Sequence, residues 1–277
     1  MVKCKEITGR ILQLLCAVVL FAVPPLPSTA DEGGVNALRF PIHMWNKSLL
    51  DIIDVGPLIL SRGEEIVMQP YPKNDSDITK KELEYLLHIA QTERSEENIR
   101  RINYENGGAR VFDIFKSEGL IPDNNHKVLN LLEMVDNDYL YFTLFFKKHF
   151  SRPRPSQLSE IVTGTPLDLV IENPHHAAYP SGHSGQTYIV ALVLADLDPK
   201  NVEIYKQFSL DVAHRREIAG VHYPSDSEAG RQLARDVYAT LKKIPAFNKK
   251  LDDVKEAFIK PSKDVITAVD EFKRDYE

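Results

Sequence analysis

Apolar residues recur three or four positions apart through most of the chain, which is the spacing of a helix face. The longest example is residues 126–150, and two prolines, Pro153 and Pro155, follow it as expected stops. A capping-box pattern, Thr79-x-x-Glu82, predicts another helix start. The same spacing predicts further helices over residues 95–106, 109–117, 184–197, 202–220 and 225–243. Since no run alternates apolar and polar residues, we predict an all-α fold.

Breaks in this pattern divide the chain after residue 30 into three parts. Glycine and proline interrupt short apolar runs over residues 31–78, which we interpret as an irregular N-terminal arm. Residues 79–250 form the predicted helical domain, and residues 251–277 a charged helical tail.

The first thirty residues have the three parts of a secretory signal peptide. Basic residues precede an apolar run at residues 11–23, and the segment closes with small residues, the last of which is Ala30. That run is too short to span a bilayer comfortably, so an uncleaved anchor is the less favoured alternative. We expect cleavage after Ala30 and a periplasmic or secreted protein. No membrane span is predicted later, because the longest apolar stretch, residues 188–197, contains Asp196.

Composition excludes several classes of protein. The 277 residues are 43% apolar and 27% charged, which is ordinary for a globular chain and excludes wholesale disorder. The net charge of −6 argues against nucleic-acid binding, which needs a basic face. The two cysteines, Cys4 and Cys16, exclude a disulfide scaffold and a four-cysteine zinc site.

Three short motifs carry the candidate chemistry. They are Lys147-x6-Arg154-Pro155, Pro180-Ser181-Gly182-His183 and Arg216-x5-His222-x3-Asp226. Each alone is explained as the polar end of a helix or a surface turn. Together they supply the fixed cations and N–H donors that a transferring phosphoryl group needs.

The cations and the second motif are suited to holding phosphate. Lys147, Arg154 and Arg216 provide three positive charges, and arginine forks match phosphate oxygens in bidentate fashion. Ser181 and Gly182 precede an apolar helix, whose free N–H groups and dipole favour an anion. Gly182 allows close approach to the backbone, and Ser181 adds a hydroxyl donor.

Two histidines divide the remaining work. One can attack phosphorus through a neutral ring nitrogen, while the other protonates the leaving oxygen. His222 has a carboxylate four residues on, Asp226, which can hold one ring nitrogen and fix the tautomer. His183 lacks an acid nearby in sequence, so it is the better candidate for proton donor.

With these motifs in this order, residues 60–255 resemble the type-2 phosphatidic-acid phosphatase and vanadium haloperoxidase superfamily. The closest resemblance is to bacterial class A non-specific acid phosphatases. It implies an all-α fold with the site between facing helices, His222 as a nucleophile that forms phosphohistidine, Asp226 orienting it and His183 as the acid. It implies that Lys147, Arg154, Ser181, Gly182 and Arg216 hold phosphate.

The resemblance also implies small phosphomonoester substrates, namely nucleotides, sugar phosphates and aryl phosphates. No metal or other cofactor is required by phosphatase members, and homodimers or larger assemblies are common among them. The chain departs from the family pattern where Arg215 replaces the usual serine, and where a cysteine pair after the first motif is missing. Arg215 is interpreted either as a contact behind the site or as a surface residue.

The remaining histidines are interpreted without a catalytic role. His175 and His176 are not predicted to bind a metal, because adjacent histidines face different ways and no third ligand is suitably spaced; they are expected on a loop near the pocket mouth. His149 and His214 are expected to be structural.

The sequence therefore favours an exported acid phosphatase with a broad range of phosphomonoesters. Three alternatives remain open at this point: a vanadium-dependent haloperoxidase, a lipid phosphatase acting at a membrane face, and a periplasmic phosphate-binding module.

Overall fold

The structure is a computed structural model that describes residues 34–107 and 110–267. Over those ranges all regular structure is helical, which confirms the predicted all-α class. The helices are α1 (Lys47–Val55), α2 (Asp77–Thr92), α3 (Glu96–Asn106), α4 (Val111–Ser117), α5 (His126–Phe150), α6 (Pro155–Thr163), α7 (Gly182–Leu197), α8 (Val202–Ile218), α9 (Pro224–Leu241) and α10 (Pro245–Glu256). The predicted signal peptide, with cleavage after Ala30, lies outside the described residues, as do residues 268–277 of the tail.

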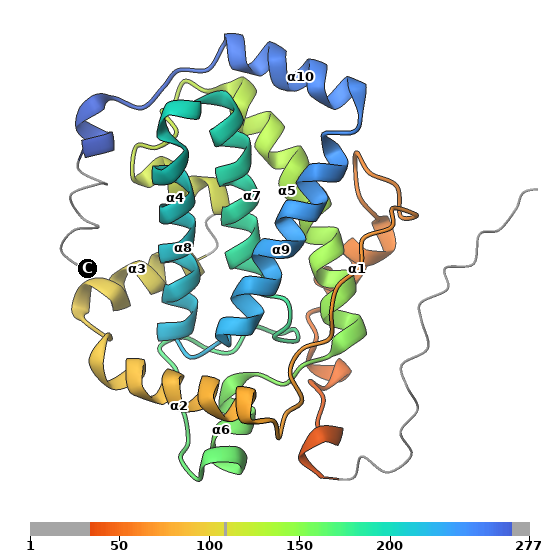
Figure 1. Cartoon of the computed structure of the whole chain (residues 1–277), viewed down its shortest axis with the longest axis vertical. Helices are drawn as coiled ribbons and strands as arrows, with labels where there is room; N and C mark the ends of the chain where they lie inside the picture. The colour runs from red at the N-terminus through yellow and green to blue at the C-terminus, as the bar shows by residue number, and fades with distance from the viewer. Residues whose placement is uncertain (1–33, 108–109, 268–277) are drawn as a thin grey trace, which may run out of the picture. The chain divides into compact units, whose positions relative to one another are not determined.

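Helix α7 is the central element of the helical body. It packs most extensively against α8 and α9 and also contacts α5, and Figure 1 shows it between α8 and α9. Its residues are apolar or small around most of its circumference, so it is buried on several faces. Helices α4 and α10 also contact α7, which encloses a continuous apolar core.

Helix α5 presents its apolar face to this core, as its periodicity predicted. Val128, Leu131, Val135 and Tyr139 are each at most 1% exposed. The helix ends because Ser151 adopts a left-handed conformation (φ 50°) and because the next residue precedes Pro153, which disfavours helical backbone. The chain after α5 therefore runs extended through the first motif.

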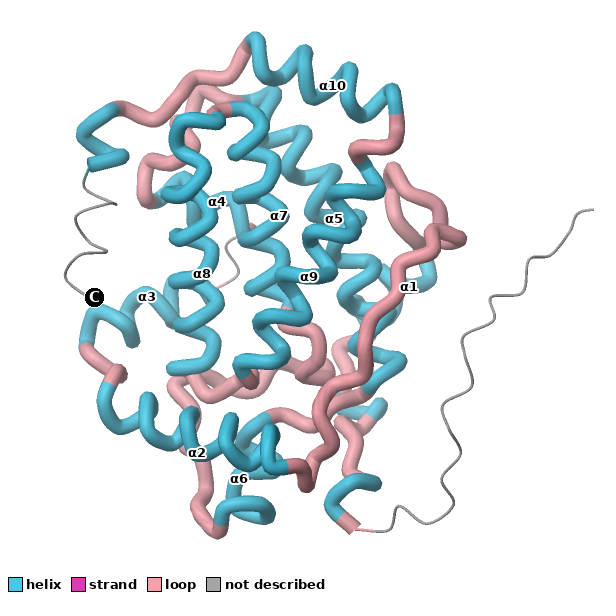
Figure 2. Tube along the Cα trace, in the orientation of Figure 1, coloured by secondary structure: helices cyan, strands magenta, loops and turns pink. Residues whose placement is uncertain are grey.

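A second apolar cluster lies beside the ends of these helices. It combines Leu83 and Leu86 of α2, Ile102 of α3 and Leu158 of α6 with Ala178 and Val221 from the loops that lead into α7 and α9. Figure 2 shows those loops at the end of α7 and α9 that faces α2 and α6. The three motifs thus share one end of the helical body.

Two predictions about the N-terminal arm need correction. The arm contains helix α1, whose N-cap Asn46 accepts a hydrogen bond from the Ser48 N–H at 3.0 Å. Helix α2 begins at Asp77 rather than Thr79, and the side chain of Ser76 caps it. Glu82 is therefore inside the helix and buried, not a capping residue.

Three predictions about the later helices also differ from the structure. Pro155 begins α6, although we interpreted it as the end of the preceding helix, because proline is favoured at the first helical position. Helix α7 begins at Gly182, two residues before the predicted start. Helix α10 spans the predicted boundary between residues 250 and 251.

Candidate active site

Backbone hydrogen bonds join the three motif segments to one another. The Ala178 N–H donates to the carbonyl of Arg152 at 3.0 Å, and the Ser181 N–H donates to the carbonyl of Asp226 at 2.9 Å. A cavity of about 130 Å³ lies where they meet. Five of the predicted residues line it: Lys147, Gly182, His183, Arg216 and His222. The other three, Arg154, Ser181 and Asp226, are fully buried, and Arg154 and Asp226 both contact His222.

His222 is held at both ring nitrogens. Its Nδ1 lies 3.1 Å from Asp226 Oδ2, and its Nε2 lies 3.1 Å from Arg154 Nη1. A guanidinium only donates, so Nε2 carries the lone pair and Nδ1 the proton. Burial lowers the pKa of His222 well below its usual value, and the charges of Arg154 and Lys147 lower it further. The ring is therefore neutral, with its nucleophilic nitrogen among cations.

Asp226 is bound at each of its oxygens. Oδ2, which contacts His222, also accepts a hydrogen bond from the backbone N–H of Tyr223 at 3.1 Å. This second bond forms because Asp226 lies in the first turn of α9. Oδ1 accepts from Arg152 Nη1 at 2.6 Å. Arg152 also donates to Glu82 Oε2 at 3.2 Å, and its guanidinium stacks 3.7 Å from the centre of the Tyr223 ring. Arg152 and Glu82 are site residues that sequence reasoning missed.

The predicted cations are buried at the site. Lys147 Nζ donates to the carbonyls of Ala177 and Ala178 at 2.9 Å each, and burial lowers its pKa well below the usual value. Arg154 Nη1 also donates to the carbonyl of Val221 at 2.7 Å. Burial lowers the pKa of Arg154 to about 9, so this guanidinium stays charged at neutral pH.

Arg216 has donors left over for an anion. Its Nη2 lies 3.4 Å from Asn106 Oδ1, while its Nε and Nη1 are buried without a partner. Burial lowers its pKa to about 10, so it too remains charged. Buried guanidinium donors without partners are costly, and an anion in the cavity would satisfy them.

The start of α7 forms another wall of the cavity. Ser181 caps the helix, and its hydroxyl accepts from the Ser184 N–H at 3.5 Å. Gly182 and His183 therefore lie in the first turn, where backbone N–H groups lack intrahelical partners. Ser181 itself is fully buried and its hydroxyl caps the helix, and its predicted contact with phosphate stays a prediction.

His183 faces the cavity from this first turn. Its Nε2 lies 3.4 Å from the carbonyl of Glu105 on α3. Burial lowers the pKa of His183 to about 3, with the charge of Arg216 acting in the same direction. A phosphate dianion beside the ring would oppose both effects.

Arg215 is buried rather than on the surface. Its Nε donates to Glu105 Oε1 at 2.7 Å, and the two side chains form an ion pair away from water. The carbonyl of Glu105 contacts His183. Arg215, which stands where the family usually has serine, therefore anchors the part of α3 that contacts the second motif.

His176 lines the cavity on a loop, as predicted for the pocket mouth. Its Nδ1 lies 3.0 Å from Arg154 Nη2, so it accepts a hydrogen bond from that guanidinium. His214 is structural, as predicted, and binds Glu93 at 2.7 Å. Across residues 34–107 and 110–267, no group of three or more His, Cys, Asp or Glu side chains is arranged to hold a metal ion.

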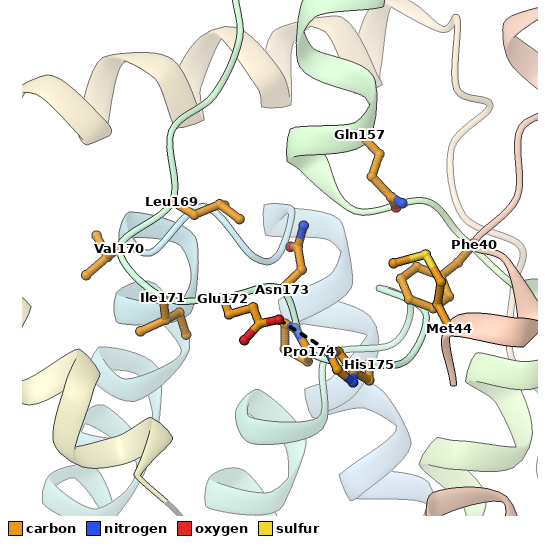
Figure 3. A pocket seen from close by; sticks show the side chains of 10 residues that line it. All are labelled: Phe40, Met44, Gln157, Leu169, Val170, Ile171, Glu172, Asn173, Pro174 and His175. Atoms are coloured by element: carbon orange, nitrogen blue, oxygen red, sulfur yellow. Dashed lines mark hydrogen bonds and ion pairs between the residues drawn. The ribbon is translucent and has the colours of Figure 1, made fainter. Parts of the chain in front are cut away.

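A larger surface pocket lies beside the cavity but lacks its chemistry. Figure 3 shows this pocket, about 480 Å³, between Phe40, Met44 and the loop of residues 169–175. It shares only Pro174 with the cavity and contains none of the predicted site residues. We therefore place the site in the smaller cavity.

Comparison with known proteins agrees with the fold and the motifs. Residues 132–246 match the PAP2 superfamily. The chain is also similar to a solved structure titled as a bacterial vanadium-dependent iodoperoxidase, with a TM-score of 0.51, 18% identity and coverage of 62% of this chain and 50% of that one. That likeness concerns the fold alone.

The curated relatives are non-specific acid phosphatases, which confirms the resemblance found in the motifs. The protein of Salmonella typhimurium is 32% identical over 151 residues, 53% of this chain and 59% of that protein. The protein of Providencia stuartii is 27% identical over 180 residues, 63% of this chain and 71% of that protein. The chain thus spans somewhat under two thirds of the Salmonella protein. Within the described ranges no helix is long and apolar enough to cross a membrane.

Proposed function

We propose that this chain is an exported acid phosphatase that hydrolyses phosphate monoesters through a phosphohistidine on His222. The observation that carries the proposal is a neutral His222, bound to Asp226 through Nδ1, with Nε2 3.1 Å from Arg154 and with Lys147 and Arg216 on the same cavity wall. A phosphate-binding module needs cations but has no need of an oriented nucleophile. The signal-like first thirty residues support export.

In the first step, the phosphoryl group binds between Lys147, Arg216 and the first turn of α7. Arg154 shifts a donor from His222 Nε2 to a phosphoryl oxygen, which frees the lone pair. Nε2 then forms a bond to phosphorus while the ester P–O bond breaks. The leaving oxygen takes a proton from His183, and Asp226 stabilises the positive charge on the His222 ring.

In the second step, water attacks the phosphohistidine. His183, now neutral, takes the proton of the attacking water, and the P–N bond breaks to release phosphate and restore His222. The bound dianion supports the first protonation of His183, because it opposes the charge of Arg216. The three cations supply the charge that a metal ion would otherwise provide, so we propose a metal-independent reaction.

The three cations bind the phosphoryl group, which all phosphate monoesters share, and this supports a broad range of nucleotides, sugar phosphates and aryl phosphates. The test is trapping of the covalent intermediate from labelled aryl phosphate, quenched in alkaline detergent because phosphohistidine is labile to acid. Wild type and His149→Ala, a matched histidine variant at the exposed end of α5, should retain label. His222→Ala should retain none, and label in that variant would contradict the proposal.

Metal independence is tested on the same protein. Turnover in excess chelator should equal turnover without it. A loss that a divalent ion restores would overturn the metal-free reaction.

A further inference from the structure

One polar side chain on the cavity wall has no part in the proposed reaction. Gln186 lies one helical turn after Gly182 on α7 and lines the cavity. Its Oε1 is 3.6 Å from the position that a Cβ on Gly182 would occupy, so this oxygen stands beside the start of α7. The side chain therefore reaches the edge of the proposed phosphate position.

Asp136 on α5 determines which end of the Gln186 amide faces the cavity. Gln186 Nε2 donates to Asp136 Oδ1 at 2.9 Å. An ionised carboxylate only accepts hydrogen bonds, so it holds the NH2 end of the amide and directs the oxygen the other way. Burial raises the pKa of Asp136 to about 6, and the carboxyl is therefore ionised at pH 7.5.

An amide oxygen is unsuited to binding a phosphoryl group, because both are hydrogen-bond acceptors. It is suited to a hydroxyl group on the alcohol part of the ester. Leu140 and Leu144, which line the same cavity, are apolar, so they do not compete for that hydroxyl. The recognition available at this position is acceptance from a donor close to the ester bond.

We propose that Gln186 selects the leaving group, and that its Oε1 accepts a hydrogen bond from a hydroxyl of a polyol phosphate. This inference rests on the proposed phosphatase function. It names phosphate esters of polyhydroxylated alcohols as the substrate class that this wall favours over esters without hydroxyl groups.

The test compares glycerol 3-phosphate with propyl phosphate at pH 7.5, since the two alcohols differ only in their hydroxyl groups. In Gln186→Met, kcat/KM for glycerol 3-phosphate should fall roughly tenfold, the size of one lost hydrogen bond, while propyl phosphate stays within about twofold. Inhibition by inorganic phosphate should not change, because the phosphate contacts remain. Asp136→Asn should lose roughly threefold for glycerol 3-phosphate only, because an uncharged partner lets the amide face either way.

The matched control is Gln232→Met, which removes the same kind of bond, Gln232 Nε2 to Asp236 Oδ1 at 3.0 Å, on the exposed face of α9. It should leave both substrates unchanged. Equal losses for the two substrates in Gln186→Met, or no loss for either, would overturn the selection by Gln186 alone. No turnover of either substrate or of phenyl phosphate by wild type would instead overturn the proposed function, and this inference with it.

Discussion

Arg152 Nη1 lies 2.6 Å from Asp226 Oδ1, on the carboxylate oxygen opposite the one that meets His222. Both side chains are fully buried. Glu82 on α2 binds the far side of the same guanidinium at 3.2 Å. A row of charged groups therefore leads from α2 to the proposed nucleophile, and Arg152 is its centre.

Replacing Arg152 should affect both stability and the reaction. Arg152→Met leaves two carboxylates without their partner and should lower the free energy of unfolding by about 3–5 kcal/mol. Arg152→Lys keeps the charge but not the fork, so it should be milder and lower kcat by roughly tenfold with little change in KM. Urea unfolding and steady-state kinetics measure these effects.

A readout that distinguishes positioning from mere structural support is the pH profile. In Arg152→Met the negative charge of Asp226 is no longer offset by Arg152, so it stabilises the protonated form of His222 and raises the pKa of that ring. The acid limb of kcat/KM should therefore move to higher pH. Arg100→Met, at an exposed pair with Glu97, is the control and should leave the profile in place. An unmoved acid limb in Arg152→Met would limit Arg152 to stability.

Replacing each of two glycines of α7 with alanine should have a different effect on the stability of the fold. A Cβ on Gly182 would have ordinary contacts, the nearest at 3.6 Å, so folding should be unimpaired. The added methyl would stand where phosphate approaches the backbone, so inhibition by inorganic phosphate should weaken by roughly tenfold, the scale of one lost hydrogen bond. A Cβ on Gly185 would overlap Tyr139 Oη and the carbonyl of Gly230.

Gly185→Ala should therefore destabilise the fold, by about 1–3 kcal/mol or more, because backbone must move to relieve the overlap. Thermal unfolding of both variants, with phosphate inhibition of Gly182→Ala, checks the contrast. Equal stability losses in the two variants would contradict it.

His183→Ala should impair the reaction according to the leaving group. An alkoxide needs a proton to depart, so hydrolysis of an alkyl phosphate should slow by roughly 10²–10⁴-fold. Nitrophenolate departs more readily unaided, and the loss for its ester should be smaller. Single-turnover rates with both substrates make the comparison, and an identical loss for the two would remove His183 from the role of acid.

The stability of the fold should decline toward alkaline pH through His214. The carboxylates of Glu217 and Glu93 raise its pKa to about 9, with the shorter contact, 2.7 Å, to Glu93. A folded pKa above the free value of about 6.5 means that the protonated ring stabilises the fold below pH 6.5. That contribution is lost as pH rises through 9.

Melting temperature measured from pH 6 to pH 9.5 should therefore fall less in His214→Gln than in wild type. His126→Gln, at an exposed histidine, should follow the wild-type curve. Parallel curves for wild type and His214→Gln would show that this ion pair contributes nothing.

Periodicity predicted the long helices well because the apolar residues that form the buried face of each helix recur at helical spacing in the sequence. The bounds expected for α5 match the structure. Helix α1 was missed because nine residues make a marginal helix alone, and its stability comes from packing on α5. Helix α6 was missed because Pro155 is compatible with both the end of one helix and the first position of the next.

The three motifs could be predicted because each is contiguous and occupies a helix end. Glu82 gave no signal, since only the fold brings α2 against the third motif. Arg152 did leave a trace in the sequence. It stands two residues before Arg154 in a stretch that prolines keep extended, where alternate side chains share a side. Both arginines accordingly reach the same His–Asp pair.

The hydrogen bond from the Ser181 N–H to the carbonyl of Asp226 joins the start of α7 to the start of α9. The sixteen residues of α7 then carry the chain about 24 Å away, to the turn of residues 199–201. Because residues 199 and 200 are exposed, we expect insertions or fused peptides there to leave the proposed site undisturbed. Engineering of this protein therefore has room at the end of α7 that lies farthest from the proposed site.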